Sequence, residues 1–255
     1  MTARPLYLQP TLPARVTLDA AVALRIRIEG QSGLRTPLTK ISRVVCNHNV
    51  QWDSDALVAC LQQGVPIAFL DARGKAIGWC FGARRRETTM ANLLAHALEA
   101  DDWDQRFAPW LDGQHRARAA QALLLCGLAT SGAHLSDVRT VLCNLHRTRL
   151  GVPAGAALGK LEALARCDVA AALADAVGEA PLLAWHRPGL NLIDAFAGLV
   201  CIHAHTVINT TQELPAADQT ARWATQTYEK HAGLFAQSTG ALIGAFELFL
   251  REHWL

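Results

Sequence analysis

Residues 38–79, LTKISRVVCNHNVQWDSDALVACLQQGVPIAFLDARGKAIGW, decide the fold of this chain. The apolar runs 41–46 and 65–70 are short and bounded by polar residues, Gly or Pro, which is typical of strands. Residues 54–63 between them have the spacing of a short helix. A polar turn is expected at residues 71–75. The stretch therefore predicts a strand, a bend, a short helix and a second strand.

The pattern changes from strands to helices near residue 86. Before that point, residues 23–29 alternate apolar and charged side chains, so Leu24, Ile26 and Ile28 are expected on one sheet face. Beyond it the periodicity is helical, and Gly- and Pro-containing segments separate the helices. Helices are expected at residues 88–103, 114–127, 135–150, 154–177, 191–208 and 216–253.

Two details of the helical half are explicit expectations. The dipeptide Asp112-Gly113 is assigned to a separator between two helices, and Gly233 is an alternative break within the last helix. Strands followed by helices predict an α+β chain. We expect a small β-rich domain at residues 1–86 and an all-helical domain at residues 87–255.

Composition favours a folded, reduced protein. Hydrophobic residues make up 51% of the 255, which is enough for buried cores. The seven cysteines include no Cys-x-x-Cys pair, so we expect free thiols and a cytoplasmic location. No signal-peptide pattern and no continuous apolar run of about 18 residues is found, so no membrane partner is expected.

Charge is distributed unevenly along the chain. The net charge is only +2, yet residues 1–90 hold 12 basic and 6 acidic residues, and residues 91–255 hold 12 and 16. A cationic segment between two domains can follow a phosphate backbone without recognising sequence. Candidate DNA-binding residues are Arg84, Arg85 and Arg86 at the junction, and Arg116, Arg118, Arg147 and Arg149 in the helical half.

The stretch 38–79, together with Pro5-Leu6-Tyr7-Leu8 and residues 23–29, resembles the N-terminal half of the CRISPR-associated adaptation integrase, the first of the Cas proteins. The resemblance implies a β-rich domain that pairs two subunits and a helical domain that carries the chemistry. It also implies a metal-dependent endonuclease and integrase that joins DNA ends during spacer acquisition in antiviral defence. A small ferredoxin-like adaptation protein is the partner that the resemblance implies.

The catalytic pattern of that family is only partly present. The family has a glutamate in a helical Glu-Gly segment, a histidine ending a Gly-Phe-Leu-His-like turn, and two acids three residues apart in the next helix. His186 and Asp194 match the histidine and the first of these acids, but Ala197 stands where the second should be. No Glu-Gly occurs in residues 91–255, and the nearest substitute is Glu162, whose alternative role is a solvated helix face. His186 and Asp194 are the candidate metal ligands.

Three functions remain open at this stage. The leading hypothesis is a homodimeric, integrase-like protein that binds prespacer or repeat DNA with a degenerate metal site, acting as a scaffold or beside an active integrase subunit. The second is an active enzyme that rebuilds its site from Glu162, His186 and Asp194 and uses Mg²⁺ or Mn²⁺. The third is a dimeric protein-interaction module without enzymatic activity. Whether the chain is an enzyme is not decided by its sequence.

Overall fold

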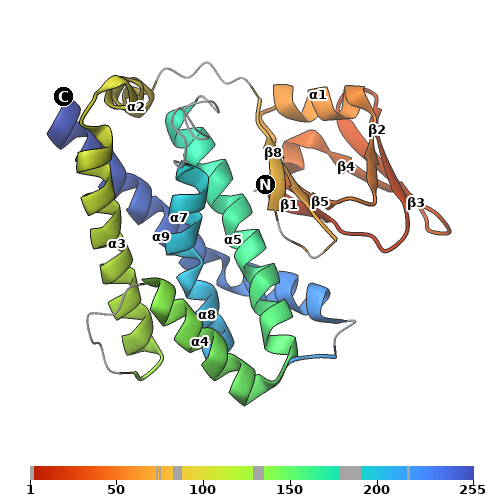
Figure 1. Cartoon of the computed structure of the whole chain (residues 1–255). Coiled ribbons are helices and arrows are strands. Elements are labelled where there is room, and N and C mark those ends of the chain that lie inside the picture. The colour runs from red at the N-terminus through yellow and green to blue at the C-terminus, as the bar shows by residue number, and fades with distance from the viewer. Residues whose placement is uncertain are drawn as a thin grey trace. The chain divides into compact units, whose positions relative to one another are not determined.

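A computed structural model of the chain describes residues 3–72, 74, 76–82, 88–128, 135–178, 191–216 and 219–255. These residues form two compact units, the first almost wholly before residue 87 and the second wholly from residue 87 on (Figure 1). The first is β-rich with one α-helix, and the second is all helical in the part described. The α+β class expected from the sequence is confirmed.

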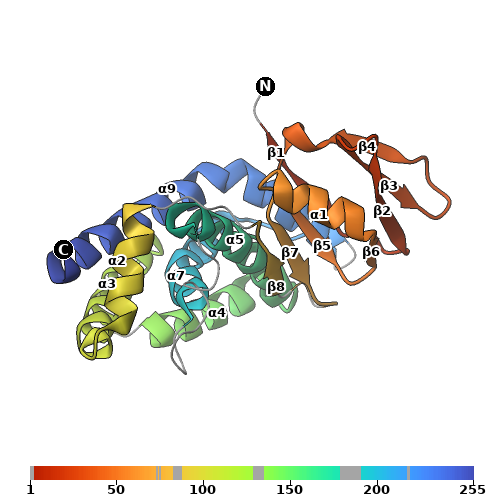
Figure 2. The same ribbon diagram turned by 90° about the horizontal axis from the view of Figure 1, so that it is seen from above.

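The first unit contains two four-stranded sheets (Figure 2). The first sheet has the order β1-β5-β7-β8, in which β1, β5 and β7 are parallel and β8 is antiparallel to β7. The second has the order β4-β3-β2-β6, with β6 parallel to β2. The strands are β1 (Arg4–Leu8), β2 (Ala14–Asp19), β3 (Ala23–Ile28), β4 (Leu34–Pro37), β5 (Ile41–Asn47), β6 (Val50–Trp52), β7 (Ile67–Leu70) and β8 (Ala76–Cys80).

Alternation in the strands produces the core of this unit. Leu24 and Ile26 of β3 are buried and Ile28 is partly buried against the same cluster, as their period of two predicts. Helix α1 (Ser54–Gln62) adds Ala56 and Cys60 to that core. The predicted strand, short helix and strand of residues 41–70 are confirmed, with the second strand two residues shorter at its start. The expected bend between the first strand and the helix contains a further short strand, β6.

The apolar strand residues do not form an open surface. Leu24, Val44, Val65 and Ile67 are each at most 4% exposed within the unit itself. Apolar strand residues that a small unit cannot cover would favour pairing of two subunits, but two sheets and α1 enclose these four together. Pairing of two subunits through this unit stays a prediction from the resemblance alone.

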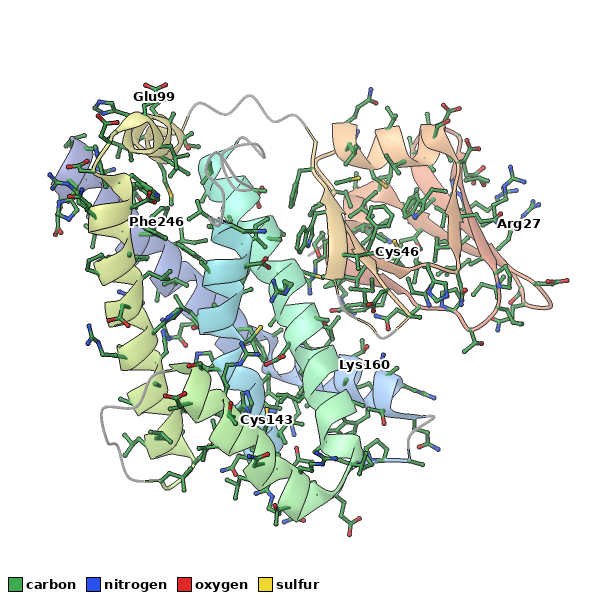
Figure 3. The ribbon with its side chains drawn as sticks, in the orientation of Figure 1. Arg27, Cys46, Glu99, Cys143, Lys160 and Phe246 are labelled. Carbon is green, nitrogen blue, oxygen red and sulfur yellow. The ribbon has the colours of Figure 1, made fainter. Side chains whose placement is uncertain are left out.

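The second unit is built around three packed helices. Helix α5 (Pro153–Val177) packs against α7 (Leu192–Val200) and α9 (Thr220–Trp254). An aromatic cluster joins α3 to α9, in which Trp103 stacks on Phe107 and meets Phe246 edge to face. Figure 3 shows Phe246 of this cluster. The remaining helices are α2 (Thr89–Glu99), α3 (Trp103–Leu125), α4 (Leu135–Leu150) and α8 (Ile202–Thr210).

Helix α3 corrects two sequence-based boundaries. The predicted helix 88–103 ends at Glu99, because Ala100 is extended, and a new helix starts at Trp103. That new helix continues through Asp112-Gly113, which the sequence assigned to a separator. Aromatic packing of Phe107 and Trp110 on α9 outweighs the helix penalty of about 1 kcal/mol for one glycine.

The C-terminal helices also differ from expectation. The predicted helix 191–208 divides at Cys201 into α7 and α8. Conversely, α9 runs unbroken through Gly233, so the alternative break there is wrong. A Cβ at Gly233 would meet nothing within 4 Å, so the glycine is not required by any close approach of another segment.

Two helical segments are long and apolar enough to cross a membrane by length and composition. The segment Leu192–Thr210 has a mean hydropathy of 1.4, and 72% of its apolar window is buried within the fold. Helix α9 has a mean hydropathy of 1.3 with 39% buried. Core helices of globular proteins meet the same criteria, so these values are weak evidence for a membrane and the absence of a membrane partner stays a prediction.

Candidate functional site

Helices α4, α5 and α7 bring the two described candidate acids toward one face of α5. Arg139 of α4 donates from Nη2 to Oε1 of Glu162 at 2.6 Å. One turn further along α5, Arg166 donates to Oδ1 of Asp194 on α7. Because residues four apart in a helix share a face, Glu162 and Arg166 present their side chains to the same side. Each acid is therefore held by an arginine.

The Glu162 side chain is partly buried, at 21% exposed. Desolvation raises its pKa, and the neighbouring Arg139 and Arg166 lower it in the opposite direction. Its Oε1 also lies 3.8 Å from Nε2 of His205, which is fully buried on α8. The expectation of a solvated helix face at Glu162 is wrong, because its carboxylate lies against Arg139 of α4 and His205 of α8.

Two buried histidines, His205 and His146, stack on each other, and His205 lies next to Glu162. His205 and His146 of α4 stack with ring centroids 5.5 Å apart. Burial lowers the pKa of His146 to about 4 and that of His205 to about 3. Both rings are therefore neutral near pH 7, and His205 adds no positive charge beside Glu162.

Asp194 lies in the first turn of α7, where a negative charge stabilises the helix. The Asn191 side chain caps this helix by accepting from the Asp194 backbone N–H at 3.1 Å. Three residues later, at the position of the missing second acid, Ala197 is 0% exposed. A carboxylate at this position would therefore be buried.

The implied divalent metal ion does not fit the residues that the structure describes. A divalent ion needs several oxygen ligands, but Oε1 of Glu162 and Oδ1 of Asp194 already accept from Arg139 and Arg166. Within the described ranges, no cluster of three or more His, Cys, Asp and Glu side chains has metal-binding geometry. His186 lies outside the described residues, and its role stays a prediction.

Asp112 is an acidic residue that was not predicted as a site residue. The structure places Asp112-Gly113 inside α3, and this acid-glycine pair differs from the helical Glu-Gly of the family by one methylene. Asp112 also meets an arginine, since its Oδ2 lies 2.6 Å from Nη2 of Arg116. The sequence signal for Asp112 is an Asp-Gly pair within a helix, taken as a variant of Glu-Gly.

The cationic candidates have different surroundings. Arg84, Arg85 and Arg86 lie outside the described residues. Arg116 is exposed and paired with Asp112, whereas Arg118 is half-buried and donates to Ser238 Oγ at 3.1 Å. Desolvation lowers the pKa of Arg118. Of these two, Arg116 is the more accessible to a phosphate.

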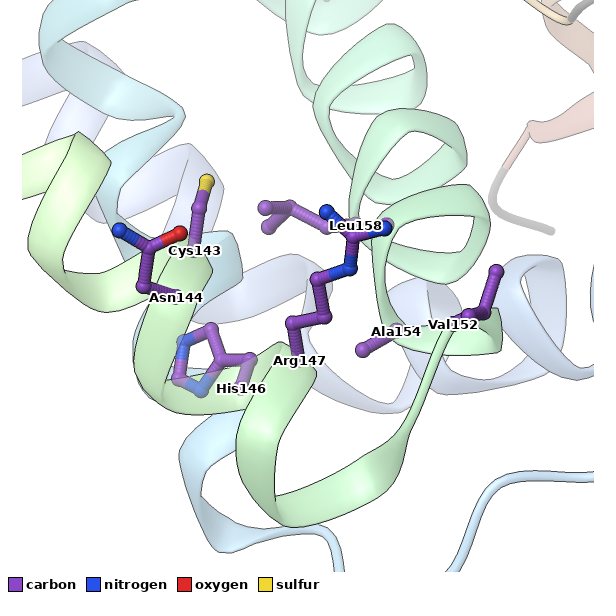
Figure 4. A pocket seen from close by; sticks show the side chains of 8 residues that line it. Cys143, Asn144, His146, Arg147, Val152, Ala154 and Leu158 are labelled. Carbon is purple, nitrogen blue, oxygen red and sulfur yellow. The ribbon is translucent and has the colours of Figure 1, made fainter.

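Arg149 and Arg147 end helix α4 but do different things. Arg149 donates to the carbonyl oxygens of Ile208 and Asn209 at 2.7 and 2.6 Å, so it caps the C-terminal end of α8. Arg147 is exposed and lines a pocket between α4 and α5 (Figure 4). Arg149 therefore stabilises the fold, while the guanidinium of Arg147 faces a cavity.

Comparison with known proteins identifies the architecture. The family model described as CRISPR associated protein Cas1 matches residues 16–109. A Cas1 protein from Thermotoga maritima has a similar structure, with a TM-score of 0.72 at 10% identity over 96% of each chain. The chain is Cas1-like. No curated protein matches it.

Two further solved structures resemble this Cas1-like chain. One is TtCas1 in complex with DNA, with a TM-score of 0.61 at 13% identity over 94% of this chain and 91% of that one. The other is a casposase bound to an integration product, with a TM-score of 0.63 at 12% identity over 89% of this chain and 82% of that one. At these identities the likeness establishes the fold, and the Cas1-like fold extends over both units.

Proposed function

We propose that this Cas1-like chain is an integrase-like, DNA-binding protein of CRISPR spacer acquisition that lacks a complete metal site. It is a scaffold, or the partner of a second and active integrase subunit, within a cytoplasmic assembly. The resemblance supports a homodimer and a small ferredoxin-like adaptation protein as further partners. Prespacer or repeat DNA is the proposed ligand, and the similarity to DNA-bound relatives supports it.

The observation that carries the proposal is that each described candidate acid is paired with an arginine. Asp112, Glu162 and Asp194 each have an arginine beside the carboxylate, namely Arg116, Arg139 and Arg166. A divalent ion at any of these carboxylates would lie close to a guanidinium, whose positive charge repels it. With Ala197 buried, the closing helix supplies one acid where the family supplies two.

Strand transfer on a labelled prespacer, with Mg²⁺ or Mn²⁺, tests the proposal. We expect no metal-dependent integration by the chain alone, together with retained DNA binding. Integration that Asp112→Asn, Asp194→Asn or His186→Ala abolishes, while the exposed control Asp104→Asn retains it, would show an active enzyme instead. The absence of any DNA binding at low salt would favour the protein-interaction module.

A further inference from the structure

The pocket between α4 and α5 has the size of a small-ligand site. Its volume is about 340 Å³, at the lower end of the range for ligand pockets in proteins. Apolar side chains from the start of α5 and the preceding loop form one wall, including Val152, Ala154 and Leu158. Asn144 and Arg147 of α4 form a polar wall (Figure 4). An apolar wall opposite a few polar groups is the common arrangement for binding a planar organic group.

The charge of the pocket favours an anion. Arg147 is the charged residue of its lining, and no acidic residue of the described chain lines it. The N-terminal turn of α5 also borders it through Ala154 and Gly155. Their N–H groups make long turn bonds of 3.2 and 3.3 Å, to Gly151 and Val152. The positive end of a 25-residue helix therefore borders the same pocket as the Arg147 guanidinium.

A buried imidazole in the same lining is independent evidence for a ligand. His146 is 1% exposed, and neither of its ring nitrogens has a hydrogen-bond partner of good geometry among the described residues. The backbone of His205 lies near the ring and raises its pKa, against the larger effect of desolvation. Buried polar groups without a partner are uncommon and often belong to a site.

We infer that this pocket binds a nucleoside monophosphate unit, with the phosphate at Arg147 and the α5 N-terminus and the base against Val152 and Leu158. Asn144, whose amide is both donor and acceptor, faces the base edge. The unit is either a free mononucleotide or the 5′-phosphorylated end of a DNA strand. The inference goes beyond the proposed function, since binding of a mononucleotide needs neither strand transfer nor a CRISPR assembly.

Calorimetric titration of the full chain with deoxyadenosine and deoxycytidine 5′-monophosphates tests the first source. Arg147→Gln should weaken binding roughly tenfold, because it removes a charge-assisted contact with the phosphate. Val152→Trp fills the mouth of the pocket from a position that is 75% exposed, so it should prevent binding while the melting temperature stays unchanged. Arg222→Gln, an exposed arginine of α9, is the control for loss of one charge.

Single-stranded oligonucleotides with a 5′-phosphate or a 5′-hydroxyl test the second source. If free nucleotides do not bind but the phosphorylated strand binds better, and Arg147→Gln removes that advantage, the ligand is a strand end. If neither probe binds, or Arg147→Gln and Arg222→Gln weaken binding equally, the inference is wrong. A wild-type chain that binds these probes but not duplex DNA would support this site and refute the proposed function.

Discussion

Ala197 stands at the position where the resemblance places a second acid. Because its side chain is fully buried, an acid restored there would be an uncompensated buried charge. We expect Ala197→Asp to lower the free energy of unfolding at pH 7 by about 3 kcal/mol relative to Ala197→Asn, which has the same shape without the charge.

The difference between the two variants should depend on pH. Burial raises the pKa of a carboxyl, so the folded aspartate takes up a proton more readily than the unfolded one, and stability falls as pH rises above about 4. Denaturant unfolding should therefore make Ala197→Asp and Ala197→Asn similar near pH 3 and different near pH 7. Equal stability at pH 7, or a gain of metal-dependent strand transfer, would contradict this account.

His146 and His205 should make the fold sensitive to acid. Their folded pKa values, about 4 and about 3, lie below the ordinary 6.5, so the stabilisation is complete above about pH 6.5 and is lost as pH falls toward 4. A shift of this size corresponds to roughly 3 kcal/mol for His146 alone. Unfolding free energies between pH 7 and 4.5 should fall steeply.

Replacing the ring identifies the source of that acid sensitivity. His146→Leu should flatten the pH dependence, whereas His96→Leu at an exposed position of α2 should leave the slope as in the parent chain. An unchanged slope in His146→Leu would show that other groups titrate in this window.

At the scale of elements, the continuity of α3 can be tested with glycine. A Cβ at Gly113 meets nothing within 4 Å, so Gly113→Ala should stabilise the protein by about 0.5–1 kcal/mol. Gly127 follows the same helix with a φ of +70°, where alanine is strained, so Gly127→Ala should destabilise it by about 1–2 kcal/mol. Thermal unfolding measures both changes in stability. Destabilisation by Gly113→Ala would contradict a continuous α3 and would indicate a turn at Asp112-Gly113.

At the scale of the whole molecule, the proposed function requires a path for DNA. We expect the combined change of Arg84, Arg85 and Arg86 to Ala to lower the slope of log affinity against log salt by roughly 2 to 3. A variant that has lost three phosphate contacts releases fewer counterions when it binds. His186→Ala should change affinity and slope less. Titration of one duplex at several salt concentrations compares the variants.

A charge-matched variant separates local contacts from net charge. Changing Arg15, Arg27 and Arg222 to Ala removes the same charge from exposed, scattered positions and should alter the slope less than the junction variant. If the junction variant keeps its affinity and slope while His186→Ala loses both, the helical unit contains the working site.

The sequence by itself determined the α+β class, the short elements of residues 41–70 and the exact span of α4, because strand alternation and helical periodicity are local properties. It also aligns Ala197 with an acid of the family pattern, which stays a prediction. It did not reveal that α3 continues through Gly113, since aromatic packing on α9 overrides the local preference of Asp-Gly for turns.

Only the tertiary structure decided the state of the candidate site. Glu162 seemed a solvated helical residue, but α4 and α8 bury it beside Arg139 and His205, which are distant from it along the chain. Burial and the pairing of acids with arginines depend on which helices meet, and a periodic pattern does not specify helix partners. For the same reason, the pocket between α4 and α5 and the capping of α8 by Arg149 became visible only once the helices were packed.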